Sequence, residues 1–501
     1  MNVPGIDIAG LFSLSTLFAM ILGTFIGLLI GTLPGLGATV AIVLLLPLTY
    51  SMSPLASILL LVAAYQGAEY GGSISSIVIG VPGTPAATAT VLDGNALAKK
   101  SYPGKALGYS LTASTVGGLV GGVVLLFLSV PLARLGVRFA DPEFFLIALL
   151  GLMAVAGLSS KDITKSIISI LLGLAIGTVG MDVFTGVPRF TMGRLELMEG
   201  ITMVALLVGM FAFSEVISMI SEDLHKRYVT NAKELKTRIS FKEFKGVFRS
   251  TMVGSAIGSI VGILPGMGAG PASWFAYSEA KRSSKHPERF GTGEPDGIAA
   301  PEAANNATVG GALVPLLALG IPGSPSTAII LGAFIIHGIQ PGPKIFTEET
   351  ELLSGILYGF LVATILMYIL GKLVTPMFSK AMTLPNPILI PIVLLLSVIG
   401  VFAAKGLFFD LWIALFIGVA SFFLKKLDFS LPAFILAFVL SPLIEQSLRR
   451  SLLLSEGSYS IFVTRPYSLV LMVLLALIVL FSIYKSMKRK GTSGDSNGIT
   501  A

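Results

Sequence analysis

The sequence predicts an all-α polytopic membrane protein, and three observations support this prediction. Of the 501 residues, 54% are hydrophobic and only 12% are charged, and the mean hydropathy is +0.88. Such a chain has too little polar surface to cover a soluble globule of this size. Several apolar runs approach the roughly 20 residues that a helix needs to cross a bilayer, whereas a membrane barrel would show alternating segments instead. Examples of these runs are residues 111–132, 201–220, 352–370 and 469–484.

The charge and the absence of cysteine limit the function further. The net charge of +7 could indicate a nucleic-acid partner, but the basic residues lie between the apolar runs and in the tail. The positive-inside rule explains that distribution. Cysteine is absent, which excludes disulfides and thiolate chemistry. The first basic residue is Lys99, so the N-terminus lacks the basic region of a signal peptide, and we expect the first apolar segment to be retained.

Two kinds of Pro-Gly motif interrupt the apolar runs, and each occurs twice. Leu-Pro-Gly-Leu-Gly within residues 31–38 returns as Leu-Pro-Gly-Met-Gly within 262–269, and Val-Pro-Gly-Thr-Pro within 80–85 returns as Ile-Pro-Gly-Ser-Pro within 320–325. Proline lacks a backbone donor and glycine admits positive φ, so each motif predicts a broken or re-entrant helix. Broken backbone persists at membrane depth only where protein buries it or where it lines an aqueous cavity. The motifs could instead only permit kinks and close packing, but their repeated order favours a binding site.

This repeated order predicts two structural repeats and an extra C-terminal helix. The first repeat covers residues 1–221, a basic cytoplasmic loop covers 222–249, and the second repeat covers 250–450. Residues 451–501 hold the C-terminal helix and a disordered tail. The basic cluster at 485–490 favours a cytoplasmic tail and therefore inverted repeats, although the pair Arg449-Arg450 argues against this orientation.

A helix that begins after a break presents free N–H groups and a positive dipole end, which suit an anion. Hydroxyl groups in and after the motifs could add donors. We therefore expect the substrate to contact Pro34, Gly35, Gly37, Pro82, Gly83, Thr84, Pro85, Thr88, Pro265, Gly266, Gly268, Pro322, Gly323, Ser324, Pro325 and Ser326.

Polar residues in or beside the apolar segments are the candidates for ion coupling. They are Glu69, Asp93, Asn95, Glu302, Asn305 and Asn306. Ionisable groups are costly at membrane depth and usually serve an ion or substrate path. Glu302 and Asn306 lie one helical turn apart, so with Asn305 they could coordinate a cation or bind a carboxylate. Hydrogen bonding between helices explains the same cluster equally well, and Asp93 could simply cap a helix near the interface.

We do not expect an enzyme. The sequence contains no Gly-x-x-x-x-Gly-Lys-Ser/Thr phosphate loop and no His-Glu-x-x-His zinc motif. No spacing provides a nucleophile with a base for an intramembrane hydrolase.

At these motifs the sequence resembles the large membrane subunit, or permease, of the tripartite tricarboxylate transporters, and the resemblance covers nearly the whole chain. Its specific parts are residues 31–38, 70–76, 81–85, 92–95, 264–268, 301–306 and 321–325. The resemblance implies a multi-pass secondary transporter of the bacterial cytoplasmic membrane for tricarboxylates or dicarboxylates. It also implies a small membrane subunit, an extracytoplasmic solute-binding protein and a gradient of Na⁺ or H⁺, without a cofactor.

The expected mechanism is alternating access, in which the broken segments hold the substrate near the midplane while one part of each repeat moves against the rest. A channel or exporter for small organic anions is the alternative. Saturable uptake that requires a binding protein would distinguish the two.

Overall fold

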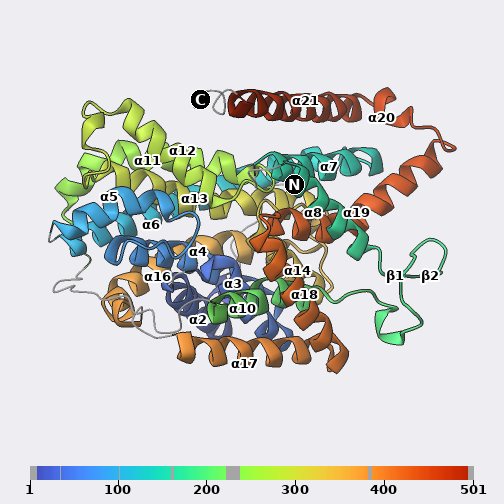
Figure 1. Ribbon diagram of the computed structural model, residues 1–501, viewed down its shortest axis with the longest axis horizontal. Helices are drawn as coiled ribbons and strands as arrows, with labels where there is room; N and C mark the ends of the chain where they lie inside the picture. The colour runs from blue at the N-terminus through green and yellow to red at the C-terminus, as the bar shows by residue number, and fades with distance from the viewer. Residues whose placement is uncertain are drawn as a thin grey trace, which may run out of the picture. The chain divides into compact units, whose positions relative to one another are not determined.

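The computed structural model describes residues 8–33, 35–100, 102–158, 163–221, 237, 239–381 and 386–494. Most of these residues are helical (Figure 1). In this part of the chain the only sheet is an antiparallel pair formed by β1 (Gly180–Met181) and β2 (Pro188–Arg189). The predicted all-α class is confirmed.

The helices on either side of the basic segment 222–236 differ in length from single turns to long spans. The described helices before it are α1 (Ile8–Leu11), α2 (Leu14–Thr32), α3 (Gly37–Leu45), η1 (Leu46–Ser51), α4 (Pro54–Val78), α5 (Thr88–Lys99), α6 (Pro103–Gly136), α7 (Asp141–Leu158), α8 (Ile163–Gly177), η2 (Leu195–Leu197), α9 (Met203–Leu207), η3 (Val208–Phe213) and α10 (Ser214–Ser221). The described helices after it are α11 (Phe241–Ile263), α12 (Ala269–Ser283), η4 (Pro287–Arg289), α13 (Asp296–Leu319), α14 (Pro325–Ile336), α15 (Ile345–Glu348), α16 (Thr350–Ala381), α17 (Asn386–Lys405), α18 (Phe408–Lys426), α19 (Leu431–Leu454), α20 (Ile461–Thr464) and α21 (Pro466–Gly494).

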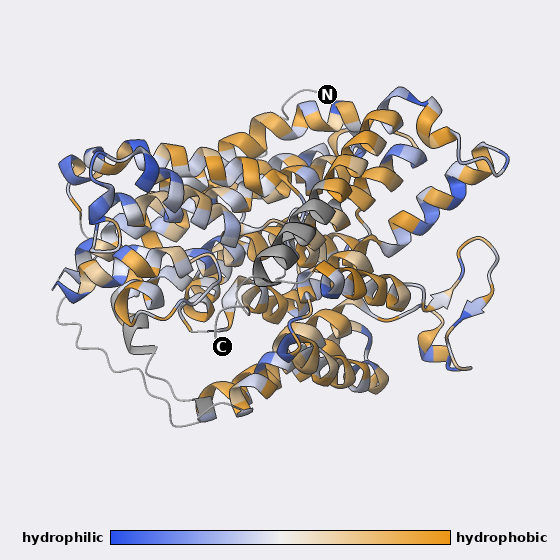
Figure 2. Cartoon of the chain, turned by 45° about the horizontal axis from the view of Figure 1, so that its top comes forward, coloured by the Kyte–Doolittle hydropathy of each residue, from blue (hydrophilic) through white to orange (hydrophobic). Residues whose placement is uncertain are grey.

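Eight helices in the described ranges are long and apolar enough to cross a membrane. Hydrophobic residues cover most of the helices, and hydrophilic residues gather at helix ends and in connections (Figure 2). Together with the helical content, this confirms a polytopic membrane protein. The spans are Leu14–Thr32, Pro103–Gly136, Met203–Ser221, Phe241–Ile263, Thr350–Thr375, Pro387–Lys405, Phe408–Lys426 and Leu431–Leu454.

All four Pro-Gly motifs separate two helices, as predicted. The first lies between α2 and α3, the second between α4 and α5, the third between α11 and α12, and the fourth between α13 and α14. Pro34, which belongs to the first motif, lies outside the described residues. The helices that follow the breaks are short, from the nine residues of α3 to the fifteen of α12. Such lengths suit half-helices better than complete spans.

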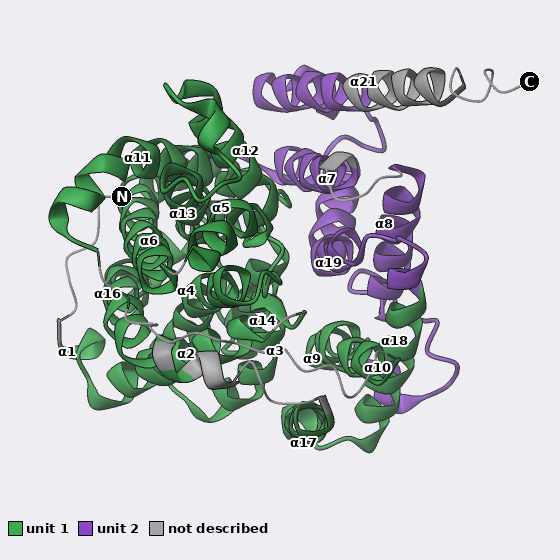
Figure 3. Cartoon of the chain, turned by 60° about the vertical axis from the view of Figure 1, so that its left-hand side comes forward, with its two compact units in different colours: residues 1–136, 201–423 green, residues 137–200, 424–501 purple. Residues whose placement is uncertain are grey.

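The chain divides into two compact units (Figure 3). Unit 1 contains residues 1–136 and 201–423, and unit 2 contains residues 137–200 and 424–501. Each unit thus takes residues from both predicted repeats, so the spatial grouping differs from the predicted order along the chain. The repeat boundaries and their inverted relation stay predictions.

In unit 1, glycines bring helices together in pairs. A Cβ atom added at Gly23, Gly27 or Gly31 of α2 would lie 2.1 to 2.3 Å from a backbone oxygen of α4. On α11, a Cβ atom at Gly254 or Gly258 would lie 2.2 Å from a backbone oxygen of α13. Small residues at helix interfaces permit this close approach, which drives helix association in membranes. The helix before each Leu-Pro-Gly break therefore packs against the helix before the following break.

The start of α11 shows how local sequence sets a helix end. Ser240 accepts a hydrogen bond from the Glu243 N–H, and the Glu243 carboxylate accepts one from the Ser240 N–H at 2.7 Å. This capping box satisfies backbone donors that have no partner within the helix. The predicted basic loop 222–249 therefore ends in helix from Phe241 onward, while its residues 222–236 and 238 lie outside the described part.

Unit 2 contains α7, α8, the β1–β2 hairpin, η2, α19, α20 and α21. Gly173 of α8 faces α19 so closely that an added Cβ would lie 2.1 Å from the Phe434 oxygen. The extra helix α21 follows α19, as predicted, and packs against α7 within this unit. The hairpin between α8 and α9 was not expected from the sequence.

Candidate functional site

The four breaks of unit 1 come together in crossed pairs. The Thr39 hydroxyl, on α3 after the first break, lies 3.4 Å from the Ser326 hydroxyl, on α14 after the fourth. A Cβ atom at Gly270, on α12 after the third break, would lie 3.8 Å from the Cβ of Pro85 in the second. Thr39 and Gly270 hold the same position relative to their Leu-Pro-Gly motifs. In Figure 3, α3, α4 and α14 lie side by side in unit 1.

The glycines of the two Leu-Pro-Gly motifs have the positive φ angles that a break in the helix was expected to use. Gly35, Gly37, Gly266 and Gly268 all have positive φ, between 65° and 90°. An added Cβ atom at Gly37 or Gly268 would meet no atom within 4 Å. These two glycines therefore border open space at the starts of α3 and α12, where unsatisfied backbone N–H groups suit an anion.

The glycines of the other two motifs are needed for close contact instead. The Gly83 N–H donates to the Gly72 oxygen at 3.2 Å, and a Cβ at Gly83 would lie 2.1 Å from the Gly31 oxygen. The Gly266 N–H donates to the Gly323 oxygen at 2.8 Å, and a Cβ at Gly323 would lie 2.8 Å from the Gly262 oxygen. In each half, the second break is thus held against the first.

The predicted hydroxyl donors have different surroundings. Thr84 and Ser324 are buried, and Ser324 caps α14 while its hydroxyl lies 3.2 Å from the Tyr65 hydroxyl. Thr88 is partly buried and donates to the Pro85 carbonyl at 2.8 Å. Ser326 is buried beside Thr39.

The motif prolines differ in burial. Pro82, Pro265 and Pro325 are partly buried, Pro322 is buried, and Pro85 is exposed.

Glu302 lies at the centre of a cage of hydroxyl groups. Its carboxylate accepts hydrogen bonds from Ser73 at 2.5 Å, Ser110 at 2.9 Å and Ser114 at 3.0 Å, and from Thr90. The residue has no exposed surface. Four donors fill the acceptor sites of a carboxylate, which offsets part of the cost of burying it. Because these donors come from α4, α5 and α6, Glu302 ties three helices to α13.

The other predicted coupling residues divide into two groups. Glu69, Asn305 and Asn306 are buried together where α4 meets α13, and the Asn305 amide donates to the Glu69 backbone oxygen at 3.1 Å. The side chains of Thr84 and Asn305 lie beside the Glu69 carboxyl group. Asp93 and Asn95 lie on α5 and have other partners.

Asp93 holds the loop that leads into α13. Its carboxylate accepts backbone hydrogen bonds from Gly291, Gly293 and Glu294 at 2.8 to 2.9 Å, and one from the Tyr277 hydroxyl at 3.0 Å. Asn95 donates to the Ile77 oxygen near the end of α4 at 3.0 Å. The structure therefore shows anchoring contacts for both residues.

Sequence reasoning missed Ser110, Ser114 and Thr39. Ser110 and Ser114 are one helical turn apart on α6, so both face α13. That spacing was the available signal, but serines are common in membrane helices and the signal is weak. Nothing local to Thr39 indicates that it meets Ser326, which is 287 residues away in sequence.

No group of three or more His, Cys, Asp or Glu residues that could hold a metal ion occurs among the described residues.

The sequence model of one protein family, the "Tripartite tricarboxylate transporter TctA family", matches residues 17–436. The chain belongs to this TctA family. It is therefore a multi-pass member of a transporter family, whose systems are tripartite and include partner subunits.

Two relatives from Agrobacterium vitis are similar to the chain, one over nearly all of it and one over about half. One is named an uncharacterized 52.8 kDa protein in the TAR-I ttuC′ 3′ region; it is 36% identical over 468 residues, which cover 93% of each chain. The other is named an uncharacterized protein in the TAR-II ttuC′ 3′ region; it is 36% identical over 233 residues, 46% of this chain and 96% of its own length. No solved structure matches the chain.

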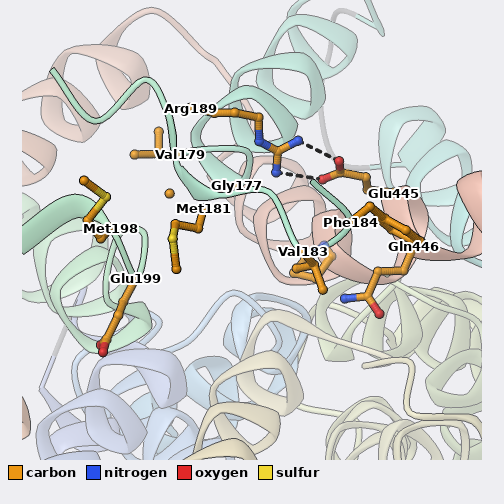
Figure 4. Close-up of a pocket in the computed structure, with 12 residues that line it drawn as sticks. Gly177, Val179, Met181, Val183, Phe184, Arg189, Met198, Glu199, Glu445 and Gln446 are labelled. Atoms are coloured by element: carbon orange, nitrogen blue, oxygen red, sulfur yellow. Dashed lines mark hydrogen bonds and ion pairs between the residues drawn. The ribbon is translucent and has the colours of Figure 1, made fainter. Parts of the chain in front are cut away.

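The chain also has a cavity in unit 2, of about 220 Å³ (Figure 4). Arg189 of the hairpin lines it and binds Glu445 of α19 through two hydrogen bonds of 2.6 and 3.1 Å. Beside it, Arg449 binds Asp182 at 2.7 Å. Guanidinium groups that bind carboxylates in this way fix the position of both partners, so the Arg189–Glu445 pair fixes one part of the cavity wall.

The pKa shifts of Asp182 and Arg189 agree with these ion pairs at the hairpin. Desolvation acts to raise the pKa of Asp182, but hydrogen bonds from the Thr185 N–H and from Arg449 hold it well below its usual range. The hydrogen bonds to Glu445 raise the pKa of Arg189. Asp182 is therefore ionised and Arg189 is charged at neutral pH.

Proposed function

We propose that this chain is the large membrane subunit of a bacterial system for the uptake of organic carboxylates. In this proposal a solute-binding protein outside the cytoplasm delivers a tricarboxylate or dicarboxylate. A small membrane subunit assists, and a gradient of Na⁺ or H⁺ drives accumulation across the cytoplasmic membrane. Membership in the TctA family supports the class of transporter and the existence of partners.

The observation that supports this function best is that the four helix breaks contact one another in pairs within unit 1. Two of the four helix starts border open space, at Gly37 and Gly268. Helix N-termini provide N–H donors and a positive dipole end, which attract carboxylate groups. Two such starts on different helices could bind two carboxylate groups of one substrate, and paired broken helices are typical of transporter binding sites.

The mechanism that fits this geometry is alternating access. The substrate would be held at the helix starts while one part of each repeat moves against the rest. The close contacts at Gly83 and Gly323 support this mechanism, because they connect the two breaks of each half and so allow both to move as one element.

Uptake of labelled citrate and other di- and tricarboxylates into proteoliposomes tests the proposal. The vesicles contain this chain and its small partner, with and without the binding protein and an imposed ion gradient. We expect saturable uptake that requires both. Uptake that ignores both would favour a channel or exporter for small organic anions and contradict the tripartite function.

A matched pair of glycine variants tests whether the breaks form the site. Gly83→Ala should lower uptake at least about tenfold, because the added methyl group would displace the second break and misplacement of about 1 Å is costly. Gly246→Ala is the control, since a Cβ there meets no atom within 4 Å. Equal uptake by both variants would contradict the placement of the site at the breaks.

A further inference from the structure

Three buried oxygen atoms where α4 meets α13 lack a hydrogen-bond donor among the described residues. They are Glu69 Oε2, Asn305 Oδ1 and Asn306 Oδ1. Asn305 and Asn306 have no exposed surface, and Glu69 is 6% exposed. Buried oxygens usually have a partner, because an unsatisfied one costs free energy. Unpaired buried acceptors of this kind suit an electropositive ligand.

The orientation of the two amide groups supports this. Asn305 Nδ2 lies 3.1 Å from the backbone oxygen of Glu69, and Asn306 Nδ2 lies 3.3 Å from that of Gln66. A carbonyl oxygen can only accept, so each amide must place its NH₂ group there. Turning either amide over would place two acceptors against each other. The Oδ1 atoms therefore cannot be satisfied by exchanging the amide nitrogen and oxygen.

The charge balance at Glu69 differs from that at Glu302. Glu302 accepts four hydroxyl donors, while no Lys, Arg or His forms an ion pair with Glu69 in the described ranges. The charged and titratable groups that act on Glu69 are Glu302 of α13 and Tyr65 of α4. Two carboxylates without a nearby cation repel each other, which favours binding of a positive charge at the less satisfied one.

We propose that Glu69 Oε2 and Asn305 Oδ1, together with the Thr84 hydroxyl, bind the monovalent cation that couples to transport, either Na⁺ or a proton. Na⁺ would be held by these three oxygens. A proton would instead sit on the Glu69 carboxyl group. Asn306 is left out of this site, because its Nδ2 group contacts Gln66 and Met367, whereas that of Asn305 contacts Glu69.

The position of this site explains how cation and substrate could be coupled, and this step depends on the proposed function. Thr84 belongs to the second break, and Tyr65, one turn before Glu69 on α4, contacts Ser324 of the fourth. An ionised Glu69 would repel a carboxylate substrate at these breaks, and a bound cation removes that repulsion. Cation and substrate would therefore bind more tightly together than alone.

Direct cation binding tests the site without any transport measurement. Purified wild-type protein, without carboxylate, is titrated with ²²Na⁺, and its infrared spectrum is followed with pH for the C=O band of a protonated carboxyl group. We expect either saturable ²²Na⁺ binding or a titrating carboxyl band, which tells Na⁺ from a proton. Glu69→Gln should abolish whichever signal is present, because its amide nitrogen can donate to Asn305 and take the cation's place.

Two further variants complete the test. Asn305→Ala keeps the carboxyl group and should weaken cation binding by about tenfold, which preserves the test if Glu69→Gln does not fold. Ser259→Ala removes another buried hydroxyl without a partner among the described residues, and it should bind the cation as the wild type does. Unchanged binding in folded Glu69→Gln or Asn305→Ala protein would overturn the inference.

The outcomes separate this inference from the proposed function. Loss of cation binding in Glu69→Gln without carboxylate uptake by the wild type would leave the site valid and contradict the function. Carboxylate uptake by the wild type with unchanged cation binding in Glu69→Gln would contradict only the site. If both hold, Glu69→Gln should still exchange carboxylate across the membrane but should not accumulate it with an ion gradient.

Discussion

Glu302 in unit 1 and Asp182 in unit 2 are both buried carboxylates, but their partners differ in kind. Glu302 accepts only neutral hydroxyl groups, from Ser73, Thr90, Ser110 and Ser114. Asp182 accepts two backbone N–H groups and the guanidinium of Arg449, with Arg189 3.4 Å away. The hairpin therefore has fixed positive charges for its acid, while the centre of unit 1 relies on dipoles.

Removing the Glu302 carboxylate should have the largest effect. Glu302→Ala leaves four buried hydroxyl groups without their acceptor, and breaking such a buried network costs roughly 3–5 kcal/mol. We expect a large fall in the thermal unfolding temperature in detergent, or no recovery of monodisperse protein. Glu288→Gln, at an exposed acid, is the control. An unfolding temperature within about 2 °C of that control would contradict the structural role of the cage.

The ion pairs of unit 2 should have a smaller, local effect. Arg449→Met removes the guanidinium from Asp182 and from the ring of Phe184, 4.9 Å away. We expect amide hydrogen exchange at residues 182–187 to accelerate roughly tenfold, because the Asp182–Arg449 pair joins this part of the hairpin to α19 and resists local opening. The neighbouring variant Arg450→Met is the matched control, since Arg450 lies 3.9 Å from Asp141 instead. Equal exchange in the two variants would show that the Asp182 pair does not hold the hairpin.

Acid should weaken the hairpin only below the unfolded pKa of Asp182, which is about 3.9. The folded pKa of Asp182 lies below the unfolded value of about 3.9, so its stabilisation is complete above that value and is lost as pH falls toward the folded pKa. We expect the protection of the hairpin amides against hydrogen exchange, corrected for intrinsic exchange rates, to be constant between about pH 7 and pH 5. A decline in protection between about pH 7 and pH 5 would contradict this prediction. The Asp182→Asn variant should lack the protection that the Asp182 carboxylate provides at every pH in this range.

The smallest effect is expected where a carboxylate pairs at the surface. Glu243 lies 2.8 Å from Lys105, and the two side chains are 30% and 49% exposed. Water already solvates both charges, so exposed pairs contribute little. Lys105→Met should therefore change the unfolding temperature by no more than about 1 °C. A fall comparable to that of Glu302→Ala would show that pairing, rather than burial, sets the size of these effects.

The sequence alone determined the membrane class, some of the spans and the four breaks. Composition and apolar run length act along the chain, and proline and glycine change the backbone where they stand, so none of these features needs tertiary information. The sequence also selected Glu69, Glu302 and Asn305, because polar residues in apolar segments are conspicuous. The same local reasoning missed the β1–β2 hairpin, which has only two residues in each strand.

Only the tertiary structure decided what each selected residue contacts. Glu302 and Asp93 look alike as isolated acids, yet one accepts hydroxyl groups from three helices and the other holds a loop about 200 residues away in sequence. Which breaks pair with which, and which oxygens lack a donor, depend on how helices far apart in the chain pack. Close packing through small glycine contacts sets those distances to fractions of an ångström, and no local pattern encodes them.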